Sequence, residues 1–195
     1  MQSIAEIPFI AGHVALDFVN TAEQRGAPEA GEALHTVDDL RLWGLRRGVL
    51  TGGADGEAGR PELSAAIEAR ELLYQLFLDR VGGHRSSDAD RARLGDLASR
   101  AYQVASLGQE ADGRLSWSWD PAQLATVRHV AVTAAVQLLS QSQSARLKQC
   151  PGDHCGWFFL DSTKRGNRRW CSMNECGQEA KTARRRERSI AHAPR

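Results

Sequence analysis

The clearest pattern of apolar positions along the chain begins at Pro61. Apolar residues follow it at intervals of three to four, as the buried face of a helix requires. Proline is well tolerated at the first helical position, where its missing N–H is not needed. The pattern therefore predicts an amphipathic helix that runs to about Val81 and ends at Gly82 and Gly83. Its inward side chains are Leu63, Ile67, Leu73, Leu76 and Phe77.

Weaker patterns on either side of this helix predict the other elements of a helical body. Residues 14–20 form a short apolar segment that fits a helix or a strand. Thr36 followed by Asp39 is typical of a helix N-cap with an acid in the first turn. A further helix is expected to begin at Ser87 or Asp88, since both residue types favour the N-cap position.

The end of the body combines a hairpin with a long helix. Residues 116–119 alternate serine with tryptophan and follow an Asp-Gly pair, which predicts a hairpin of strands at about 104–110 and 114–119. Asp120 followed by Pro121 is typical of a helix start. The nearly all-apolar residues that come next are expected to form the central helix of the core.

The composition, with 42% hydrophobic and 25% charged residues, is typical of a soluble globular protein. The most apolar stretch, residues 127–139, is interrupted by Arg128, His129 and Gln137, and is shorter than the roughly 18 residues that a membrane span needs. The first ten residues lack the basic start of a signal peptide and include Glu6. We therefore expect a cytoplasmic protein.

Charge is distributed unevenly along the 195 residues, whose formal net charge is +1. The stretch from Arg146 to the end carries 12 Lys and Arg against five Asp and Glu, a net charge of +7. The preceding body is therefore acidic, with a net charge of −6. An acidic body with a basic tail is typical of proteins that bind a polyanion, and a solvated charged tail is the alternative interpretation.

All four cysteines lie in this basic tail as two short-spaced pairs, Cys150 with Cys155 and Cys171 with Cys176. A reducing cytosol disfavours disulfides and favours metal binding for such a cluster. Two pairs joined by a loop suit a tetrahedral zinc site, and four thiolates leave no position for water or substrate. The prediction is one structural zinc ion, with His154, inside the first pair, left at the surface.

The residues between the cysteines predict the rest of a zinc finger. Residues 157–160 are expected to form a strand, and residues 168–170 the strand that returns to the third cysteine. Residues 172–188 are expected to form a helix with Cys176 in or near its first turn. The predicted fold class is mainly α with a small β-hairpin: a helical N-terminal domain followed by a small treble-clef zinc finger.

The sequence around the cysteines resembles the CGNR-type zinc finger. Residues 15–21 and 37–40 resemble the ABATE domain, which accompanies this finger in bacterial transcription regulators linked to stress. The resemblance to the CGNR-type zinc finger lies in residues 146–150, 155–161 and 167–173.

This resemblance implies an ABATE-like helical domain over residues 1–143 and a CGNR-type treble-clef finger over residues 144–195, with the four cysteines as zinc ligands. Because the helices have apolar faces of their own, the first domain is expected to fold without the metal. The chain departs from the family's Cys-Gly-Asn-Arg motif, since Gln178 and Glu179 follow Cys176 and Gly177. An acid thus replaces an arginine that would either meet a phosphate or form a local salt bridge.

The helix predicted after Cys176 is strongly basic, and at helical spacing one of its faces is cationic while Ala180 and Ala183 face the zinc module. Arginine suits bidentate contacts with phosphate and guanine, so double-stranded DNA is the expected partner. The alternative is a protein-interaction module whose helix docks on another protein or on the acidic body. The residues expected to contact nucleic acid are Arg165, Arg168, Arg169, Lys181, Arg184, Arg185 and Arg188.

The sequence contains no recognised catalytic set, so an enzyme is not expected. A treble-clef nuclease would need a catalytic histidine, and there is no histidine between the second and third cysteines. His13, Asp17, Asn20 and His129 lie near apolar segments without a catalytic spacing, and His129 is expected to be a hydrogen-bonded core residue. The sequence leaves open whether the N-terminal domain senses a small-molecule effector or a protein partner.

Overall fold

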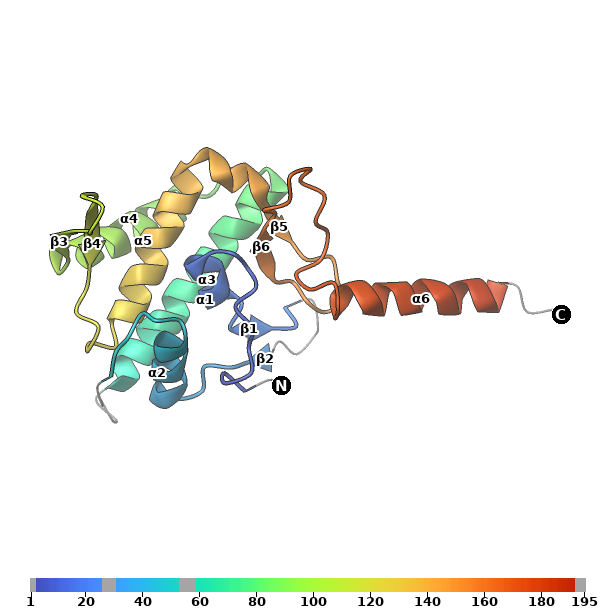
Figure 1. Ribbon diagram of the computed structural model, residues 1–195, viewed down its shortest axis with the longest axis horizontal. Helices are drawn as coiled ribbons and strands as arrows, with labels where there is room; N and C mark the ends of the chain where they lie inside the picture. The colour runs from blue at the N-terminus through green and yellow to red at the C-terminus, as the bar shows by residue number, and fades with distance from the viewer. Residues whose placement is uncertain (1–2, 26–30, 53–58, 192–195) are drawn as a thin grey trace.

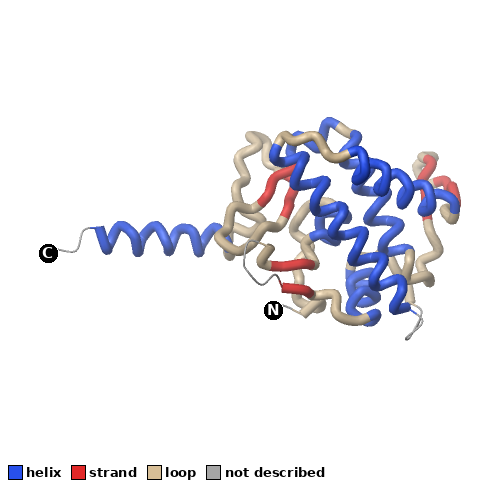
Figure 2. Tube along the Cα trace, turned by 180° about the vertical axis from the view of Figure 1, so that it is seen from behind, coloured by secondary structure: helices blue, strands red, loops and turns tan. Residues whose placement is uncertain are grey.

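The computed structural model describes residues 3–25, 31–52 and 59–191. Figure 1 shows a helical body with the last helix, α6 (Cys176–Ala191), projecting from one end and a two-stranded hairpin at the opposite end. Figure 2 shows from behind that helices dominate the body. The predicted fold class is confirmed, because a cysteine cluster that fits a small zinc finger follows a mainly helical domain.

Two long helices, α3 (Arg60–Gly82) and α5 (Thr126–Ser140), form the centre of the body. The apolar face predicted for α3 packs on the core: Leu73, Leu76 and Phe77 are buried, and Leu63 and Ile67 are partly buried. This helix ends at Gly83, whose φ of +70° is a left-handed conformation that glycine adopts without strain. Helix α5 packs against α1, α3 and α4, which confirms its predicted central position.

The other body helices begin where their capping residues predict. Thr36 and Asp39 form a reciprocal capping box, in which Asp39 N donates to Thr36 Oγ1 (3.1 Å) and Thr36 N donates to Asp39 Oδ2 (2.8 Å). The Ser87 hydroxyl accepts from Asp90 N (3.0 Å) at the start of the next helix. The ambiguous segment after residue 13 is a helix. The three helices that follow residue 13, Thr36 and Ser87 are α1 (Val14–Val19), α2 (Val37–Arg46) and α4 (Asp88–Gln103).

Antiparallel strands pair two by two in the described part of the chain. The hairpin predicted before residue 120 is present, with Leu107 paired to Trp117. A short pair, β1 with β2, was not predicted, because two-residue strands carry no periodic signal. The strands are β1 (Ala22–Glu23), β2 (Gly31–Glu32), β3 (Ser106–Gln109), β4 (Leu115–Ser118), β5 (Leu147–Gln149) and β6 (Phe158–Leu160).

The predicted start of the central helix at Asp120 and Pro121 is wrong, since α5 begins at Thr126. Asp120 forms a local turn instead: its carboxylate accepts from Ala122 N (3.0 Å), and its carbonyl accepts from Thr126 Oγ1 (2.6 Å). An aspartate carboxylate can bond the backbone two residues on as readily as it caps a helix, and here the turn is formed.

The hairpin of the zinc finger also differs from the prediction. The strand expected at 158–160 is present, but its partner is β5, which precedes the first cysteine, and not residues 168–170. The first cysteine pair therefore lies inside the hairpin. Helix α6 begins at Cys176, a few residues later than expected, after a turn in which Gly177 N donates to Ser172 O (3.1 Å).

Among the described residues, buried apolar side chains of the body and of the finger belong to one cluster. Phe158 and Phe159 of β6 are fully buried, and the Phe158 ring packs on Phe77 and Tyr74 of α3 with centroid distances of 5.8 and 5.3 Å. The hairpin that carries the first cysteine pair is thus part of the body's core. This shared core argues against independent folding of the first 143 residues.

Candidate metal centre and nucleic-acid interface

The first cysteine pair is held by the turn that joins β5 to β6. Cys150 N donates to Trp157 O (2.7 Å), and Cys155 N donates to Gly152 O (3.0 Å). A Cβ atom on Gly152 would lie 3.2 Å from both Cys155 Cβ and Cys176 Sγ, so a larger residue here would press on the cysteine side chains. The turn therefore presents two thiols to one point.

The second pair comes from the end of a loop and the start of a helix. Cys171 is buried, and Cys176 is the first residue of α6. The glycine of the family motif, Gly177, lies under two side chains, because a Cβ there would meet Met173 Sδ at 2.6 Å and Trp170 Cδ1 at 3.2 Å. Burial raises the pKa of the Cys176 thiol, while the positive dipole end of the helix N-terminus opposes this shift.

The sulfurs of Cys150, Cys155, Cys171 and Cys176 all lie within 4.8 Å of one another. Cys171 Sγ is 3.5 Å from Cys155 Sγ and 3.6 Å from Cys176 Sγ. Four sulfurs about 2.3 Å from a tetrahedral zinc ion would be about 3.8 Å apart, whereas a disulfide would require about 2 Å. The cluster therefore fits one structural zinc ion, and His154, which is exposed, lies outside it.

The chemistry of the donor set also fits a bound cation. Hydrogen bonds from the thiols of Cys155 and Cys171 lower the pKa of Cys150 to about 2, while bonding to Cys150 raises the pKa of Cys155 and of Cys171. Sulfurs this close cannot all ionise beside one another unless a divalent cation neutralises them. When bound, the zinc ion crosslinks the turn, the loop and the helix, and with four thiolates it leaves a net charge of about −2.

A buried carboxylate organises the loop between the two cysteine pairs. Asp161 Oδ2 accepts from Lys148 Nζ (2.6 Å) and Arg168 N (2.8 Å), while Oδ1 accepts from Thr163 N (3.0 Å). Burial alone would raise the pKa of Asp161, but the Lys148 ammonium and the other donors hold it well below its usual range. This loop therefore depends on an ionised Asp161.

Arg168 does not occupy the position that the sequence analysis expects. Its guanidinium lies 4.4 Å over the Phe159 ring and donates to backbone carbonyls of Ile10 (3.1 Å), Trp170 (3.0 Å) and Cys171 (2.5 Å). A side chain that donates to these carbonyls and to that of Leu160 (3.4 Å), and that stacks on a ring, holds the finger against the body. These contacts favour a structural role for Arg168 over the nucleic-acid contact that its position in the sequence predicts.

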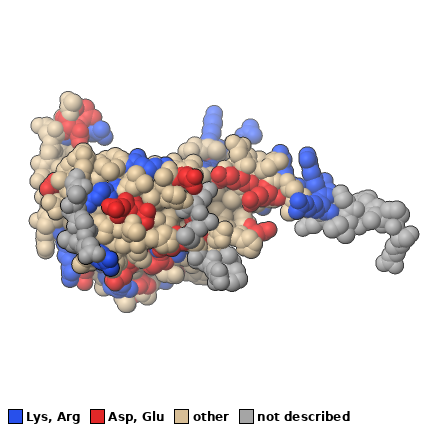
Figure 3. All heavy atoms as spheres, turned by 90° about the horizontal axis from the view of Figure 1, so that it is seen from below, with Lys and Arg blue, Asp and Glu red and all other residues tan. Residues whose placement is uncertain are grey.

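The other basic candidates lie at the surface. Arg165 and Arg169 are exposed on the loop, and Lys181, Arg184, Arg185 and Arg188 are exposed along α6. Figure 3 shows Lys and Arg gathered along the projecting helix, with Asp and Glu where it leaves the body. Ala183 is exposed, and it lies on the face of α6 that lines the groove beside the cysteines. The helix projects away from the acidic body and does not dock on it (Figure 1).

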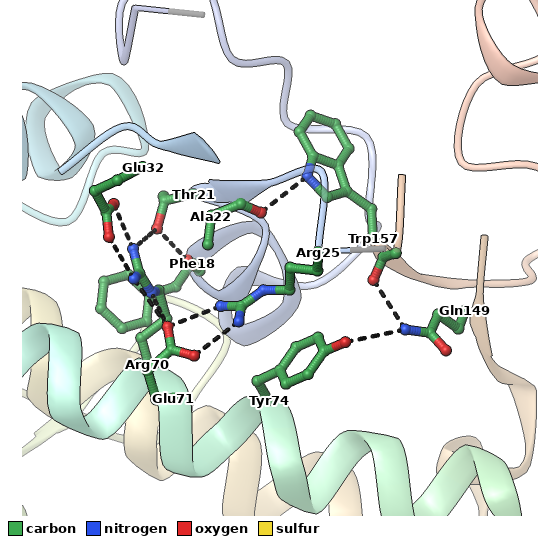
Figure 4. Close-up of polar contacts among 11 residues, drawn as sticks. Phe18, Thr21, Ala22, Arg25, Glu32, Arg70, Glu71, Tyr74, Gln149 and Trp157 are labelled. Carbon is green, nitrogen blue, oxygen red and sulfur yellow. Dashed lines mark hydrogen bonds and ion pairs between the residues drawn. The ribbon is translucent and has the colours of Figure 1, made fainter. Parts of the chain in front are cut away.

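Asn20, which directly follows α1, joins the body to the finger. Asn20 Nδ2 donates to Phe158 O and Phe158 N donates to Asn20 Oδ1, both at 2.9 Å. Trp157 Nε1 donates to Ala22 O (3.3 Å), as Figure 4 shows. The sequence signal for this joint was the polar residue Asn20 within an apolar segment. Its partner could not be predicted, because Phe158 lies 138 positions away.

An ion-pair network of buried arginines and partly exposed carboxylates lies beside this joint (Figure 4). Arg70, 2% exposed, forms a bidentate pair with Glu32 (2.7 and 2.6 Å), and Arg25 forms one with Glu71 (2.7 and 2.9 Å). Burial alone would raise the pKa of Glu32 and of Glu71, but the hydrogen bonds from the arginines lower both. The network fixes the β1 region on α3, next to Tyr74, whose hydroxyl accepts from Gln149 of the finger (3.3 Å).

A groove of about 790 Å³ lies beside the cysteine cluster, where α6 leaves the body. One wall is a face of α6, and the other is formed by the cysteine turn and the end of β1. Acidic side chains outnumber basic ones around it. The charged residues of the groove are Glu23, Asp153, Glu175, Glu179 and Arg186.

The geometry defines a zinc-finger protein, with a helical domain whose core is completed by a small four-cysteine module. The model of the ABATE family, described as "putative stress-induced transcription regulator", matches residues 12–142, and the model of the CGNR zinc finger matches residues 146–189. The chain therefore belongs to the ABATE family and carries a CGNR zinc finger. No curated protein matches the chain. In the described residues, every helix is too short or too polar to cross a membrane.

Proposed function

We propose that this chain is a DNA-binding transcription regulator of the cytoplasm that contacts duplex DNA through the basic face of α6. The observation that carries the proposal is the position of this helix, which projects from the body with Lys181, Arg184, Arg185 and Arg188 exposed. A helix of this kind fits the DNA major groove, which is about 12 Å wide. Arg165 and Arg169, exposed on the neighbouring loop, would add contacts to the phosphate backbone.

In this proposal the zinc ion has a structural role and the chain has no catalytic one, in keeping with families described as a regulator and a zinc finger. The four cysteines anchor the first turn of α6, so the rest of the helix is presented at a fixed angle to the body. The zinc–thiolate cluster itself is anionic, which places the expected DNA contacts further along the helix than Cys176.

Glu179, which replaces the arginine of the family motif, does not oppose this assignment. Glu179 lines the groove at the base of α6. Lys181, Arg184 and Arg188 lie about a third of a turn or more around the helix from it, at 100° per residue. The acid and the basic face therefore point in different directions.

The helical domain would serve as the sensing part of the regulator. A surface hollow of about 560 Å³ lies between α2 and the start of α3, lined by residues that include His35, Asp38 and Arg60. An effector bound to the body could act on the finger because Asn20 and the shared core connect the two rigidly. The alternative function is a protein-interaction module, and the acidic groove is the observation that favours it.

The test is the salt dependence of binding to random-sequence duplex DNA, with fluorescence anisotropy as the measure of binding. About six phosphate contacts predict a slope of log K against log salt near −5 per chain. A control protein of the same isoelectric point without a basic helix should show weak binding. Affinity for DNA that equals the control, or that does not change with salt, would contradict the proposal and favour the protein-interaction module.

A further inference from the structure

One face of α6 carries acidic residues near the body and a basic residue further out. Glu175 and Glu179 lie at the base of the helix, and Arg186 lies about two turns beyond Glu179. Thr182 and Ala183 stand between them on the same face. The spacing 179, 182, 183, 186 is that of a helix–helix contact stripe, in which small central residues allow a close approach.

This face is complementary in charge to itself when two copies run antiparallel. A two-fold axis that passes between Thr182 and Ala183 places Glu179 of one copy opposite Arg186 of the other, and the symmetry forms this pair twice. A parallel arrangement would instead place Glu179 against Glu179. The charge order along the helix therefore selects the antiparallel pair.

The groove beside α6 has the charge that such a partner needs. The outer half of the second copy's helix would lie over the wall formed by Asp153 and Glu175, next to the zinc–thiolate cluster with its net charge of about −2. Because α6 projects from the body, it can be reached by a second copy along its outer turns (Figure 3). The cation that a second copy of this chain brings to the groove is Arg186, the basic residue on the groove-lining face of α6.

We propose that the chain forms a two-fold dimer in which the α6 helices pair antiparallel along Glu179, Thr182, Ala183 and Arg186. Lys181, Arg184 and Arg188 lie on a different face and stay outside this contact. On each helix the basic residues lie roughly opposite the contact stripe, so the two basic faces point outward on opposite sides of the pair. In this dimer Glu179 forms an ion pair with Arg186 of the second copy. The arginine of the family motif at this position would instead repel Arg186.

The test measures self-association of the zinc-loaded chain without DNA, by sedimentation velocity over a range of concentrations. Glu179→Arg and Arg186→Glu each turn both symmetric pairs repulsive and should raise the dimer dissociation constant about tenfold or more. The double variant Glu179→Arg/Arg186→Glu restores opposite charges and should return the constant to near that of the natural chain. An equal mixture of the two single variants should form a heterodimer.

The matched control is Lys181→Glu, which makes the same change of charge as Arg186→Glu on the other face of the helix. It should leave the dimer constant unchanged, while zinc content stays at one per chain in every variant. A chain that stays monomeric at all concentrations, or a dimer that is indifferent to both single reversals, would overturn the proposal. Since no nucleic acid is present, this result is independent of whether the basic face binds DNA.

Discussion

Asn20 shows how one buried amide can join two parts of this chain. It offers both a donor and an acceptor to the backbone of Phe158, in a position that is 3% exposed. Asp161 and Arg168 act similarly, each satisfying several backbone groups around the cysteine loop. The zinc ligands were predictable because their spacing alone defines them, whereas these joints depend on partners that only the folded chain brings near.

Replacing Asn20 by Ala should lower the free energy of unfolding by about 3 kcal/mol, because a buried N–H and a buried C=O of Phe158 lose their partners. Urea denaturation followed by circular dichroism measures the change. Asn174→Ala, at an exposed position, is the control and should shift the midpoint little. Equal stability of the two variants would show that the amide does not join body and finger.

Arg168 and Arg169 are neighbours in the sequence with different predicted roles. Arg168→Ala should lower the free energy of unfolding by roughly 2 kcal/mol, since carbonyls such as those of Ile10 and Cys171 lose a charged donor. Under folding conditions it should leave the salt slope of DNA binding unchanged. Arg169→Ala should do the opposite, with little effect on stability and a slope flatter by about one unit. Reversed results would return Arg168 to the nucleic-acid interface.

At the scale of elements, local capping residues predicted most helix starts, and competing local bonds explain the errors. Thr36 and Ser87 cap helices where expected, but Asp120 forms a turn. The partner of β6 could not be read from the sequence, because residues 147–149 and 168–170 are both short and polar enough to be either strand or loop. Pairing was decided by packing of β5 and β6 on the body's core.

The ion pairs between β2 and α3 predict a pH dependence. Because the pKa of Glu32 is lowered in the folded chain, its contribution to stability is present above about pH 4.5 and is lost as the pH falls through the lower folded pKa. Glu32→Gln should cost about 2 kcal/mol at neutral pH, since Arg70 keeps only Glu71 as an ionised partner. Its unfolding free energy should then fall less steeply between about pH 5 and pH 3.

Thermal or urea unfolding at several pH values measures this effect. Glu68→Gln, an exposed change on the same helix, is the matched control and should follow the natural chain. A pH dependence that is identical in Glu32→Gln and in the natural chain would show that this pair does not contribute to acid sensitivity.

At the scale of the whole molecule, the zinc finger is part of the body's fold. Phe158 and Phe159 fill the core from the finger side, and burial of each such ring contributes about 2–3 kcal/mol. Because native domains are stable by only about 5–15 kcal/mol, the body is expected to depend on the finger. The apolar periodicity of the helices gave no sign of this, since the residues they pack against lie beyond residue 143.

A chain shortened to residue 143 should therefore lose the cooperative unfolding transition of the full chain. Circular dichroism would show reduced helix content and a broad transition, and a chain that ends at residue 188 should keep the cooperative one. In the full chain, a chelator should lower the midpoint of a single transition, because zinc binds only the folded finger. A sharp transition in the shortened chain would restore the view of two independent domains.

If the basic face of α6 binds duplex DNA, the salt dependence of DNA affinity should change in the double variant Arg184→Ala/Arg185→Ala. The slope of log K against log salt for this variant is the most direct test. If both side chains meet phosphates, the slope should flatten by about two units and affinity should fall for every sequence. The control Arg85→Ala/Arg93→Ala removes the same charge from exposed positions of the body and should leave the slope unchanged. A slope that is the same in both double variants would contradict the claim.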